Sequence, residues 1–293
     1  MKLSVVIPAH NAATTIGAQL EALARQDWDG EWEVVVSDNG STDASREIVE
    51  SFRDRLPALR ILDSSATRGA SNARNVAIRQ AHGEWILTCD ADDVVADNYV
   101  RAMAEALAVH DFVACRLDAH SLNERWLADS WPCAQETGLM DFVPPFLPSG
   151  AGGTLGFRRH VFEAVDGFNP DPKIWGREDN DFCWRVQLAG IPLHFVAKTT
   201  VNYRYPESYK RMYHQSRLLA RSSVQLYKRY QSHGMPRLSR SEALRGAVRW
   251  KRILAQLRHL RRYDPTNRAR FVRDLGHKVG RLEGSIRYGV LAF

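Results

Sequence analysis

The stretch ILTCDADD, residues 86–93, decides how the rest of the chain is interpreted, because an apolar run ends there in three carboxylates within four residues. Its first two residues are typical of a strand buried inside a parallel sheet. Asp90, Asp92 and Asp93 would then lie at the carboxyl edge of that sheet, where open α/β sheets bind ligands. Carboxylates so close together repel one another unless a cation is present, and their hard oxygens suit Mg²⁺ or Mn²⁺. Turn and cap residues give the same pattern without any ligand.

Apolar segments of strand length alternate with segments of helical periodicity along the first two thirds of the chain. Pro8 is expected to end the first strand, because proline cannot continue the hydrogen-bond ladder. The alternation predicts an α/β fold with a mostly parallel sheet. The strands are expected at 3–7, 33–36, 59–62, 84–87, 112–115, 152–159, 191–197 and 199–203.

Two further acidic positions accompany the stretch. Asp38 follows the second expected strand in the loop SDNGSTD. Glu178 and Asp179 lie in the first turn of a helix expected between Gly176 and Gly190. The positive end of a helix dipole favours ionised carboxylates, which would keep a base there unprotonated at neutral pH. Good first-turn residues without any catalytic role would look the same.

The charge of the chain is divided unevenly. Residues 1–197 contain 17 lysines and arginines against 29 aspartates and glutamates, a net charge of −12, whereas residues 198–293 contain 23 against 5, a net charge of +18. This asymmetry predicts an acidic catalytic body and a basic, mainly helical tail. Amphipathic basic helices, expected over 209–229 and 239–263, commonly lie on anionic membrane surfaces. A tail packed on the body with its charges paired is the alternative, and homo-oligomer contacts are a third role.

The remaining composition excludes several classes of protein. Four widely spaced cysteines without a C-x-x-C pair imply neither a zinc site nor a disulfide framework, so buried free thiols in a reducing compartment are expected. The start MKLSVVIPAHN has no apolar signal-peptide core. The longest uncharged run, 142–157, contains three prolines, which excludes a membrane-spanning helix. A cytoplasmic protein is expected, at most peripheral at the inner face of the membrane.

Five sequence blocks occur in a characteristic order: VIPAHN (6–11), VVVSDNGSTD (34–43), ATRGASNARN (66–75), LTCDADD (87–93) and WGREDNDFCWR (175–185). They closely resemble the blocks of family 2 glycosyltransferases, which are inverting, nucleotide-sugar-dependent enzymes with the Rossmann-like GT-A fold. The resemblance implies a GT-A catalytic domain over residues 1–205 that uses Mn²⁺ or Mg²⁺. The basic region 206–293 lies outside it and is expected to contact the acceptor, a membrane surface or another copy of the chain.

The resemblance also implies a role for each matching side chain. Asp92 is implied as the metal ligand, and Asp179 as the catalytic base with Glu178 beside it. The base would take a proton from the acceptor hydroxyl as it attacks the anomeric carbon, in one in-line displacement that inverts the sugar. The nucleotide sugar would be lined by Pro8, Ala9, Asn11, Asp38, Arg68, Arg74, Asp90 and Trp175. From the residues alone, Arg74 could equally be a solvent-exposed charge on the surface of a helix.

The sequence departs from the family pattern at Asn202, where many relatives have a histidine that helps to hold the metal or the diphosphate. His194 or His214 could take that duty, although a histidine inside an apolar strand, such as His194, more often belongs to the core. The resemblance favours a uridine diphosphate donor. The absence of a Q-x-x-R-W motif favours addition of a single sugar, to a glycan or lipid-linked precursor or to a natural product or peptide.

Two other functions compete with sugar transfer. A nucleotidyltransferase of related fold would need a Gly-rich loop with Arg or Lys after the first strand, and the chain has none there. A non-catalytic nucleotide- or nucleic-acid-binding protein could use the basic tail. No recognised nucleic-acid module is present, so nucleic acid is not expected as a partner.

Overall fold

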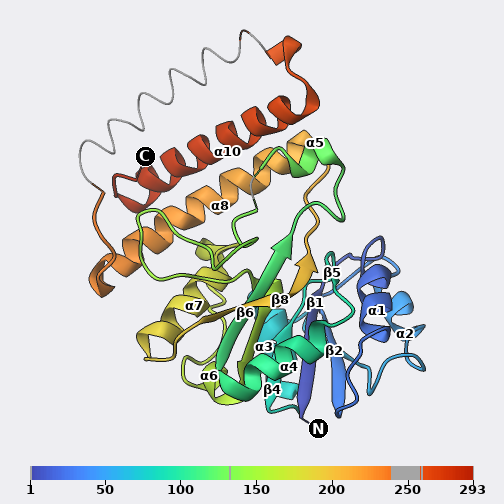
Figure 1. Ribbon diagram of the computed structural model, residues 1–293. Helices are drawn as coiled ribbons and strands as arrows, with labels where there is room; N and C mark the ends of the chain where they lie inside the picture. The colour runs from blue at the N-terminus through green and yellow to red at the C-terminus, as the bar shows by residue number, and fades with distance from the viewer. Residues whose placement is uncertain (1, 132, 239–257, 259, 293) are drawn as a thin grey trace.

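The computed structural model describes residues 2–131, 133–238, 258 and 260–292. A mixed sheet lies at the centre with helices on both of its faces, and two long helices, α8 and α10, run side by side across one end (Figure 1). The strands are β1 (Leu3–Ala9), β2 (Trp32–Asp38), β3 (Arg60–Asp63), β4 (Trp85–Thr88), β5 (Val94–Val95), β6 (Phe112–Asp118), β7 (Leu155–Arg158) and β8 (His194–Asn202). The α-helices are α1 (Ile16–Ala24), α2 (Ser45–Glu50), α3 (Ala70–Gln80), α4 (Tyr99–Val109), α5 (Arg125–Ala128), α6 (Arg159–Glu163), α7 (Glu178–Leu188), α8 (Tyr209–Tyr230) and α10 (Pro265–Tyr288). Short 3-10 turns are η1 (Gly152–Thr154), η2 (Pro172–Ile174), η3 (Gln231–His233) and η4 (Leu260–Arg262).

The strand order is β3-β2-β1-β4-β7-β6-β8-β5. Strands β3, β2, β1 and β4 are parallel neighbours, as are β6 and β8, whereas β7 runs antiparallel to both β4 and β6, and β5 antiparallel to β8. This arrangement confirms the predicted α/β, mostly parallel sheet with flanking helices. Since β1, β2 and β4 run the same way, the loops that follow them gather at one edge.

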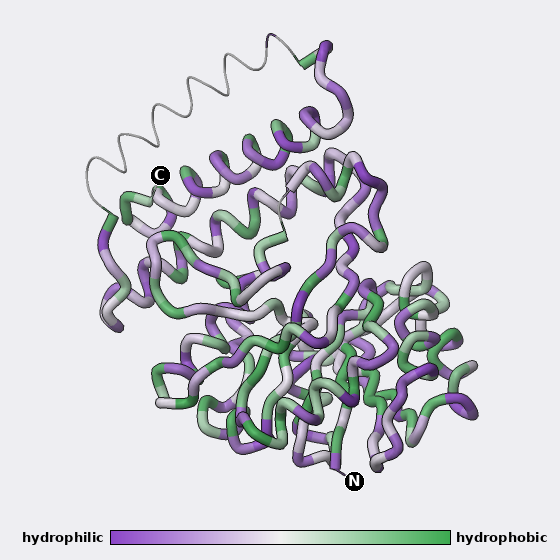
Figure 2. Tube along the Cα trace, viewed as in Figure 1, coloured by the Kyte–Doolittle hydropathy of each residue, from purple (hydrophilic) through white to green (hydrophobic). Residues whose placement is uncertain are grey.

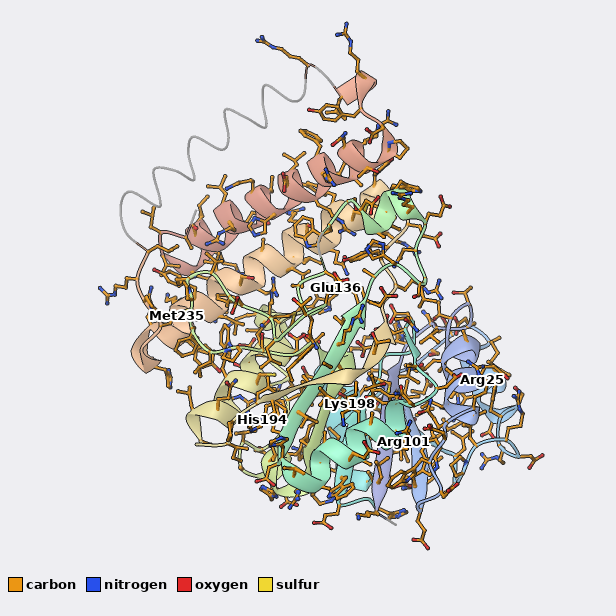
Figure 3. All side chains as sticks on the ribbon, in the orientation of Figure 1. Arg25, Arg101, Glu136, His194, Lys198 and Met235 are labelled. Atoms are coloured by element: carbon orange, nitrogen blue, oxygen red, sulfur yellow. The ribbon has the colours of Figure 1, made fainter. Side chains whose placement is uncertain are left out.

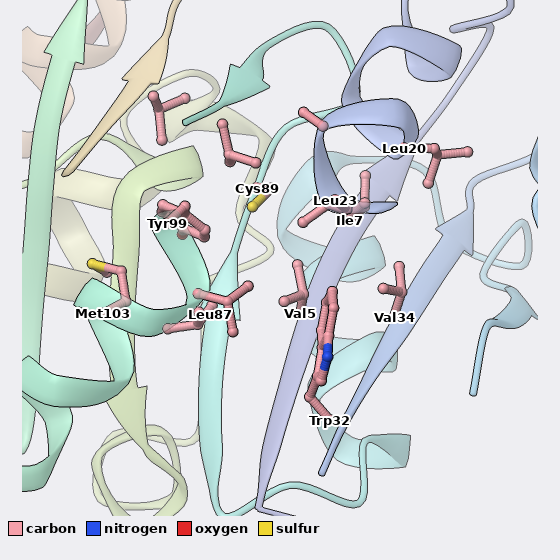
Figure 4. Packing of buried hydrophobic residues seen from close by; sticks show 14 of the residues in the cluster. Val5, Ile7, Leu20, Leu23, Trp32, Val34, Leu87, Cys89, Tyr99 and Met103 are labelled. Atoms are coloured by element: carbon pink, nitrogen blue, oxygen red, sulfur yellow. The ribbon is translucent and has the colours of Figure 1, made fainter. Parts of the chain in front are cut away.

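The core has two layers because successive side chains of a strand point to opposite faces. Val5 and Ile7 of β1 pack with helices α1, α2 and α4, as Figure 4 shows for part of this layer. Val6 points the other way and packs with α3, α6, α7 and α8. In the hydropathy view the hydrophobic segments concentrate on the strands (Figure 2). Each fully buried side chain of this size stabilises the fold by about 1.5–3 kcal/mol.

Two expected strand ends differ from the structure. Strand β1 continues through Pro8 to Ala9. The carbonyl of Val6 accepts the N–H of Cys89 on the side of β1 that faces β4, and the pairing of β1 with β4 ends at this bond. Pro8 faces the same side two residues later, where β4 no longer pairs. Its missing N–H therefore removes no hydrogen bond between strands. The two strands expected at 191–197 and 199–203 are one strand, β8, which bulges at residues 197–199 where its register with β6 shifts.

Helices α8 and α10 lie parallel and unusually close. Three glycines of α10, spaced four residues apart, face the backbone of α8: Gly276, Gly280 and Gly284. A Cβ at Gly276 would lie 2.5 Å from the carbonyl oxygen of Tyr213, and one at Gly280 would overlap that of Arg217. Small residues therefore allow this contact, which an ion pair between Arg217 and Glu283 reinforces.

The basic region contacts the body of the protein through α8. Val224, Leu226, Tyr227 and Tyr230 belong to the same buried cluster as residues of β6, β7 and α7. The division of the chain at residue 205 and the membrane contact stay predictions. The helix expected over 239–263 falls largely outside the described residues. Among the residues that are described, no helix combines the length and the apolar character needed to cross a membrane, and the four cysteines are free.

Candidate active site

The loops after β1 and β2 are fastened into one wall at the carboxyl edge of the sheet. Asn11 adopts a left-handed conformation with φ of 50°, and its Oδ1 accepts the N–H of Thr42 at 2.8 Å. Its own N–H donates to the hydroxyl of Ser41 at 3.0 Å. The buried carboxylate of Asp38 accepts from the N–H of Ser41 and from Arg46, both at 3.1 Å. Paired strand residues continue this wall: Pro8 is opposite Ser37, and Ala9 is opposite Asp38.

The buried side chain of Asn39 ties in the loop that follows β3. Its amide nitrogen donates to the carbonyl oxygens of Ser64 at 2.6 Å and Thr67 at 2.9 Å. Its amide oxygen accepts the N–H of Gly69 at 2.9 Å. The predicted nucleotide ligand Arg68 is therefore held next to the wall formed by the first two loops. Sequence reasoning did not identify Asn39.

Arg74 joins two elements that are far apart in the sequence. The residue is 4% exposed, and its Nη2 donates to Asp90 at 2.5 Å while its Nη1 donates to Glu178 at 3.3 Å. Burial works against the positive charge, yet the carboxylates of Asp90 and Glu178 outweigh it and raise the pKa of Arg74. The alternative of a solvated helix charge is therefore wrong for this residue.

Two glycines leave room for this ion-pair network. A Cβ at Gly152 would lie 2.9 Å from Nη2 of Arg74, and a Cβ at Gly153 would lie 2.9 Å from Oδ2 of Asp90. The hydroxyl of Thr88, the last residue of β4, donates to the carbonyl oxygen of Gly152 at 2.6 Å and fixes the turn. Sequence reasoning missed these glycines, although the run GAGG at 150–153 is a signal for close backbone approach.

Asp179 occupies the first turn of α7, as predicted. Its Oδ2 accepts the N–H of Gly152 at 3.1 Å, and its Oδ1 accepts that of Asn180 at 2.7 Å. Burial, followed by repulsion from Glu178, raises the pKa of Asp179 to about 6. The expected effect of the helix dipole, which favours the ionised form, is therefore smaller than the effect of burial. A carboxyl with this pKa is still mostly ionised at pH 7, as a general base requires.

Helix α7, which begins with Glu178 and Asp179, is anchored to α8. Asp181, fully buried, accepts from Arg185 at 2.7 Å, from Arg229 at 3.0 Å and from the hydroxyl of Tyr230 at 3.0 Å. Arg229 also donates to Asp171 at 2.9 Å. A second link runs through the residue before α7, where Nε of Arg177 donates to the hydroxyl of Ser223 at 3.0 Å. The basic region therefore positions the start of α7, a relation that sequence reasoning missed.

The acidic turn after β4 has the properties expected of a cation site that also uses ligands from a substrate. Desolvation within the turn, followed by the neighbouring Asp90, raises the pKa of Asp92 to about 6, although the residue as a whole is exposed. Asp93 is buried and accepts the N–H of Arg204 at 3.0 Å, which gives it a structural role. A divalent cation would relieve the repulsion at Asp92, and Mg²⁺ or Mn²⁺ commonly takes one or two carboxylates plus phosphate oxygens. Over the described ranges, no group of three or more His, Cys, Asp or Glu forms a complete protein cage.

The structure distinguishes the two histidines that could take the role of the one expected at Asn202. Asn202 pairs with Val94, two residues beyond Asp92, and so lies beside the acidic turn. His194 (Figure 3) lies at the opposite end of β8, roughly 25 Å from Asn202 along the strand. It stacks there on His110, with the ring centroids 3.8 Å apart. His194 is partly exposed, so it is not a core histidine. Its place at the far end of β8 also puts it out of reach of Asp92. His214 lies on α8, in a groove that begins at Trp175.

A hollow of about 280 Å³ lies between the start of α3 and η2. Its lining includes Arg68, Trp175 and Glu178. The structure thus brings most predicted site residues together in two adjoining groups. Asp90, Arg74, Glu178 and Asp179 form the charged centre, and Arg68 with Trp175 lies at the hollow beside it. Pro8, Ala9, Asn11 and Asp38 form the wall at the ends of β1 and β2, and Asp92 lies in the turn after β4.

Comparison with known proteins gives two family matches and several relatives. Residues 4–166 match the family described as glycosyl transferase family 2, and residues 145–215 match the N-terminal domain of galactosyltransferase. The poly(ribitol-phosphate) β-N-acetylglucosaminyltransferase TarS of Staphylococcus aureus is 34% identical over 131 residues, which are 44% of this chain and 23% of TarS. The validoxylamine A glucosyltransferase of Streptomyces hygroscopicus is 30% identical over 222 residues, 65% of this chain and 52% of the relative. The match thus covers about a quarter of the length of TarS and about half of the length of the validoxylamine A glucosyltransferase.

Solved structures show the same fold over nearly the whole chain. A complex of TarS residues 1–349 with UDP-GlcNAc superposes with a TM-score of 0.58 at 20% identity, covering 99% of this chain and 93% of the other. The mannosyltransferase PcManGT from Pyrobaculum calidifontis, in complex with GDP-Man and Mn²⁺, gives a TM-score of 0.65 at 17% identity, covering 97% and 86%. These likenesses confirm the predicted GT-A fold.

Proposed function

The chain belongs to glycosyltransferase family 2, and on that premise we propose that it transfers a single sugar from a nucleoside diphosphate to a hydroxyl acceptor, with inversion at the anomeric carbon. The donor is a uridine diphosphate sugar, and a divalent cation, Mn²⁺ or Mg²⁺, assists. The relatives TarS and the validoxylamine A glucosyltransferase differ in what they glycosylate, so family membership leaves the acceptor open.

One observation carries this proposal: the buried guanidinium of Arg74 holds Asp90 and Glu178 in a single network, with donor–acceptor distances of 2.5 and 3.3 Å. Asp90 comes from the strand end where the nucleotide is expected, and Glu178 adjoins the base Asp179 on α7. This proximity supports a base beside the reacting part of the donor, the arrangement that a single displacement requires. A protein that only bound nucleotides would not need this second carboxylate pair.

The proposed reaction follows from the state of each carboxylate. Asp179, mostly ionised at pH 7, accepts the proton of the acceptor hydroxyl while that oxygen forms its bond to the anomeric carbon. The bond from the anomeric carbon to the diphosphate oxygen breaks in the same step, so the configuration inverts. Asp92, with Asp90 nearby, would hold the cation, which supplies positive charge for the leaving diphosphate when bound. The wall formed by Asn11 and Asp38 would hold the nucleobase and the ribose of the donor.

The donor assignment draws on the relatives and on general chemistry. TarS, which resembles this chain in sequence and fold, has been solved with UDP-GlcNAc. PcManGT carries GDP-Man on the same fold, so the fold alone does not select the base. The acceptor would be a glycan or lipid-linked precursor, a natural product or a peptide.

A binding screen tests the donor and the metal together. Uridine, guanosine and thymidine diphosphate sugars would be titrated calorimetrically into the protein with Mn²⁺, with Mg²⁺ and with EDTA. We expect one uridine diphosphate sugar to bind at least tenfold more weakly in EDTA and in the variant Asp92→Ala. The matched control Asp97→Ala removes a surface carboxylate whose ion pair, within the part of the chain that the structure describes, is with Arg25, and it should bind like wild type. Absence of donor binding, or equal binding by Asp92→Ala, would refute the proposal.

A further inference from the structure

A second hollow lies along the first turns of α8, and we call it the α8 groove. It has a volume of about 440 Å³ and is open to solvent. Its lining combines apolar side chains with cationic and polar ones. Its lining residues are Trp175, Pro206, Ser208, Lys210, Arg211, His214, Gln215 and Leu218.

The α8 groove adjoins the proposed base. Trp175, 49% exposed, belongs to both this groove and the hollow beside Glu178. From Trp175 the chain turns at Gly176, with φ of 70°, where it packs against Leu219 of α8, and then enters α7. The groove therefore begins at a residue four positions before Asp179, where the chain contacts α8. An acceptor whose hydroxyl contacts Asp179 can extend past Trp175 into this groove.

The charges of the groove are uncompensated, unlike those farther along α8. Arg217 pairs with Glu283, and Arg229 pairs with Asp171 and Asp181. Within the part of the chain that the structure describes, Lys210 and Arg211 form no ion pair with a carboxylate. Their positive charges line an open hollow at the start of the basic region.

The position of these cations opposes the stability of their own helix. Lys210 and Arg211 lie in the first turn of α8, which contains no acidic residue. Positive charge at the amino-terminal end of a helix is unfavourable, because the backbone dipole is positive there. The dipole and the two side chains together create a site of concentrated positive potential, which suits an anionic ligand group.

We propose that the α8 groove binds a phosphate group of the acceptor, one sugar or polyol unit away from the reacting hydroxyl. This inference rests on the proposed function and specifies its acceptor class. Lysine and arginine together recognise phosphate through several charge-assisted hydrogen bonds, and the exposed indole of Trp175 offers a surface for the sugar or polyol unit. The phosphate can be a monoester or a diester, since either leaves an anionic oxygen.

Matched pairs of probes test the groove directly. With UDP and Mn²⁺ saturating the donor site, binding is measured by calorimetry for glycerol and sn-glycerol 3-phosphate, for ribitol and ribitol 5-phosphate, and for glycerophosphoglycerol as the diester. The measurements are repeated with Lys210→Ala/Arg211→Ala and with the matched control Lys198→Ala, which removes an exposed lysine of β8 (Figure 3). Thermal unfolding of each variant reports whether it is folded.

We expect at least one phosphorylated probe to bind wild type ten or more times more tightly than its unphosphorylated counterpart, and less tightly as salt increases. The double variant should lose this preference, and Lys198→Ala should keep it. The monoester and diester probes distinguish the two kinds of phosphate. Lack of any preference in wild type, or its persistence in the double variant, overturns the inference. Failure of the proposed function is separate, because it would appear as absence of donor binding in the nucleotide-sugar screen.

Discussion

Replacing Asp179 by asparagine should stabilise the fold, and more so at high pH. The carboxyl has a pKa of about 6 in the native protein against 3.8 in its unperturbed state, because burial and Glu178 disfavour its charge. The native fold therefore loses stability as the pH rises from the unfolded pKa through the folded one. At about 1.36 kcal/mol for each pKa unit, the loss is at most about 3 kcal/mol at pH 8 and roughly half of that at pH 5.

The variant Asp179→Asn also loses a hydrogen bond from Gly152, but this loss is the same at both pH values. The difference between the two pH values therefore reports the charge of Asp179 alone. Because the residue is partly exposed, solvent screening reduces this difference, and we expect the free energy of unfolding to increase by about 1 kcal/mol more at pH 8 than at pH 5. Urea unfolding without nucleotide or metal measures it. The control Asp43→Asn should instead have the same effect at pH 5 and at pH 8, because hydrogen bonds, chiefly from Ser45, lower the pKa of that carboxyl below 3.8 and keep it ionised over this whole range. A pH-independent effect of Asp179→Asn would refute the reasoning.

Three further substitutions test the packing around the site. Gly280→Leu drives a side chain into the backbone of α8 and should lower the free energy of unfolding by about 1–3 kcal/mol or more; an unchanged thermal midpoint would contradict the close contact. Arg229→Met removes one partner of the buried Asp181 and should cost about 2–3 kcal/mol in urea unfolding, with a smaller effect in an Asp181→Asn background. Gly153→Ala should displace Asp90 and weaken calorimetric nucleotide binding roughly tenfold while the thermal midpoint changes little; unaltered affinity would argue against that displacement.

The sequence could predict the features that depend on local patterns. Buried parallel strands are continuous apolar runs, and their acidic ends at Asp38 and Asp90 follow directly from the letters. The first turn of α7 was predictable because Gly176 and Gly190 mark the limits of the helix. Pro8 was misleading, since its effect depends on whether the neighbouring strand still pairs at that point.

The remainder depends on contacts between distant residues, which local patterns do not contain. Arg74 resembles a surface charge in sequence, and only tertiary packing against Asp90 and Glu178 makes it a buried centre. The link from α7 to α8 joins Asp181 and Arg229 across 48 residues. Lys198 lies in the middle of β8, where the strand bulges because its register with β6 shifts. The sequence does not contain this register, so the charged residue was interpreted as a boundary between two strands.

The most direct test of the central claim is the rate at which wild type and Asp179→Ala release the sugar from the donor identified by the binding screen, with water or an added acceptor as the nucleophile. A general base typically contributes a factor of about 10²–10⁴. We expect Asp179→Ala to lose at least a hundredfold in rate while its affinity for the donor stays within about threefold, because the proposed role of the residue is toward the acceptor hydroxyl and not toward the nucleotide. Full activity in Asp179→Ala would contradict the assignment of the base, and with it the proposed mechanism.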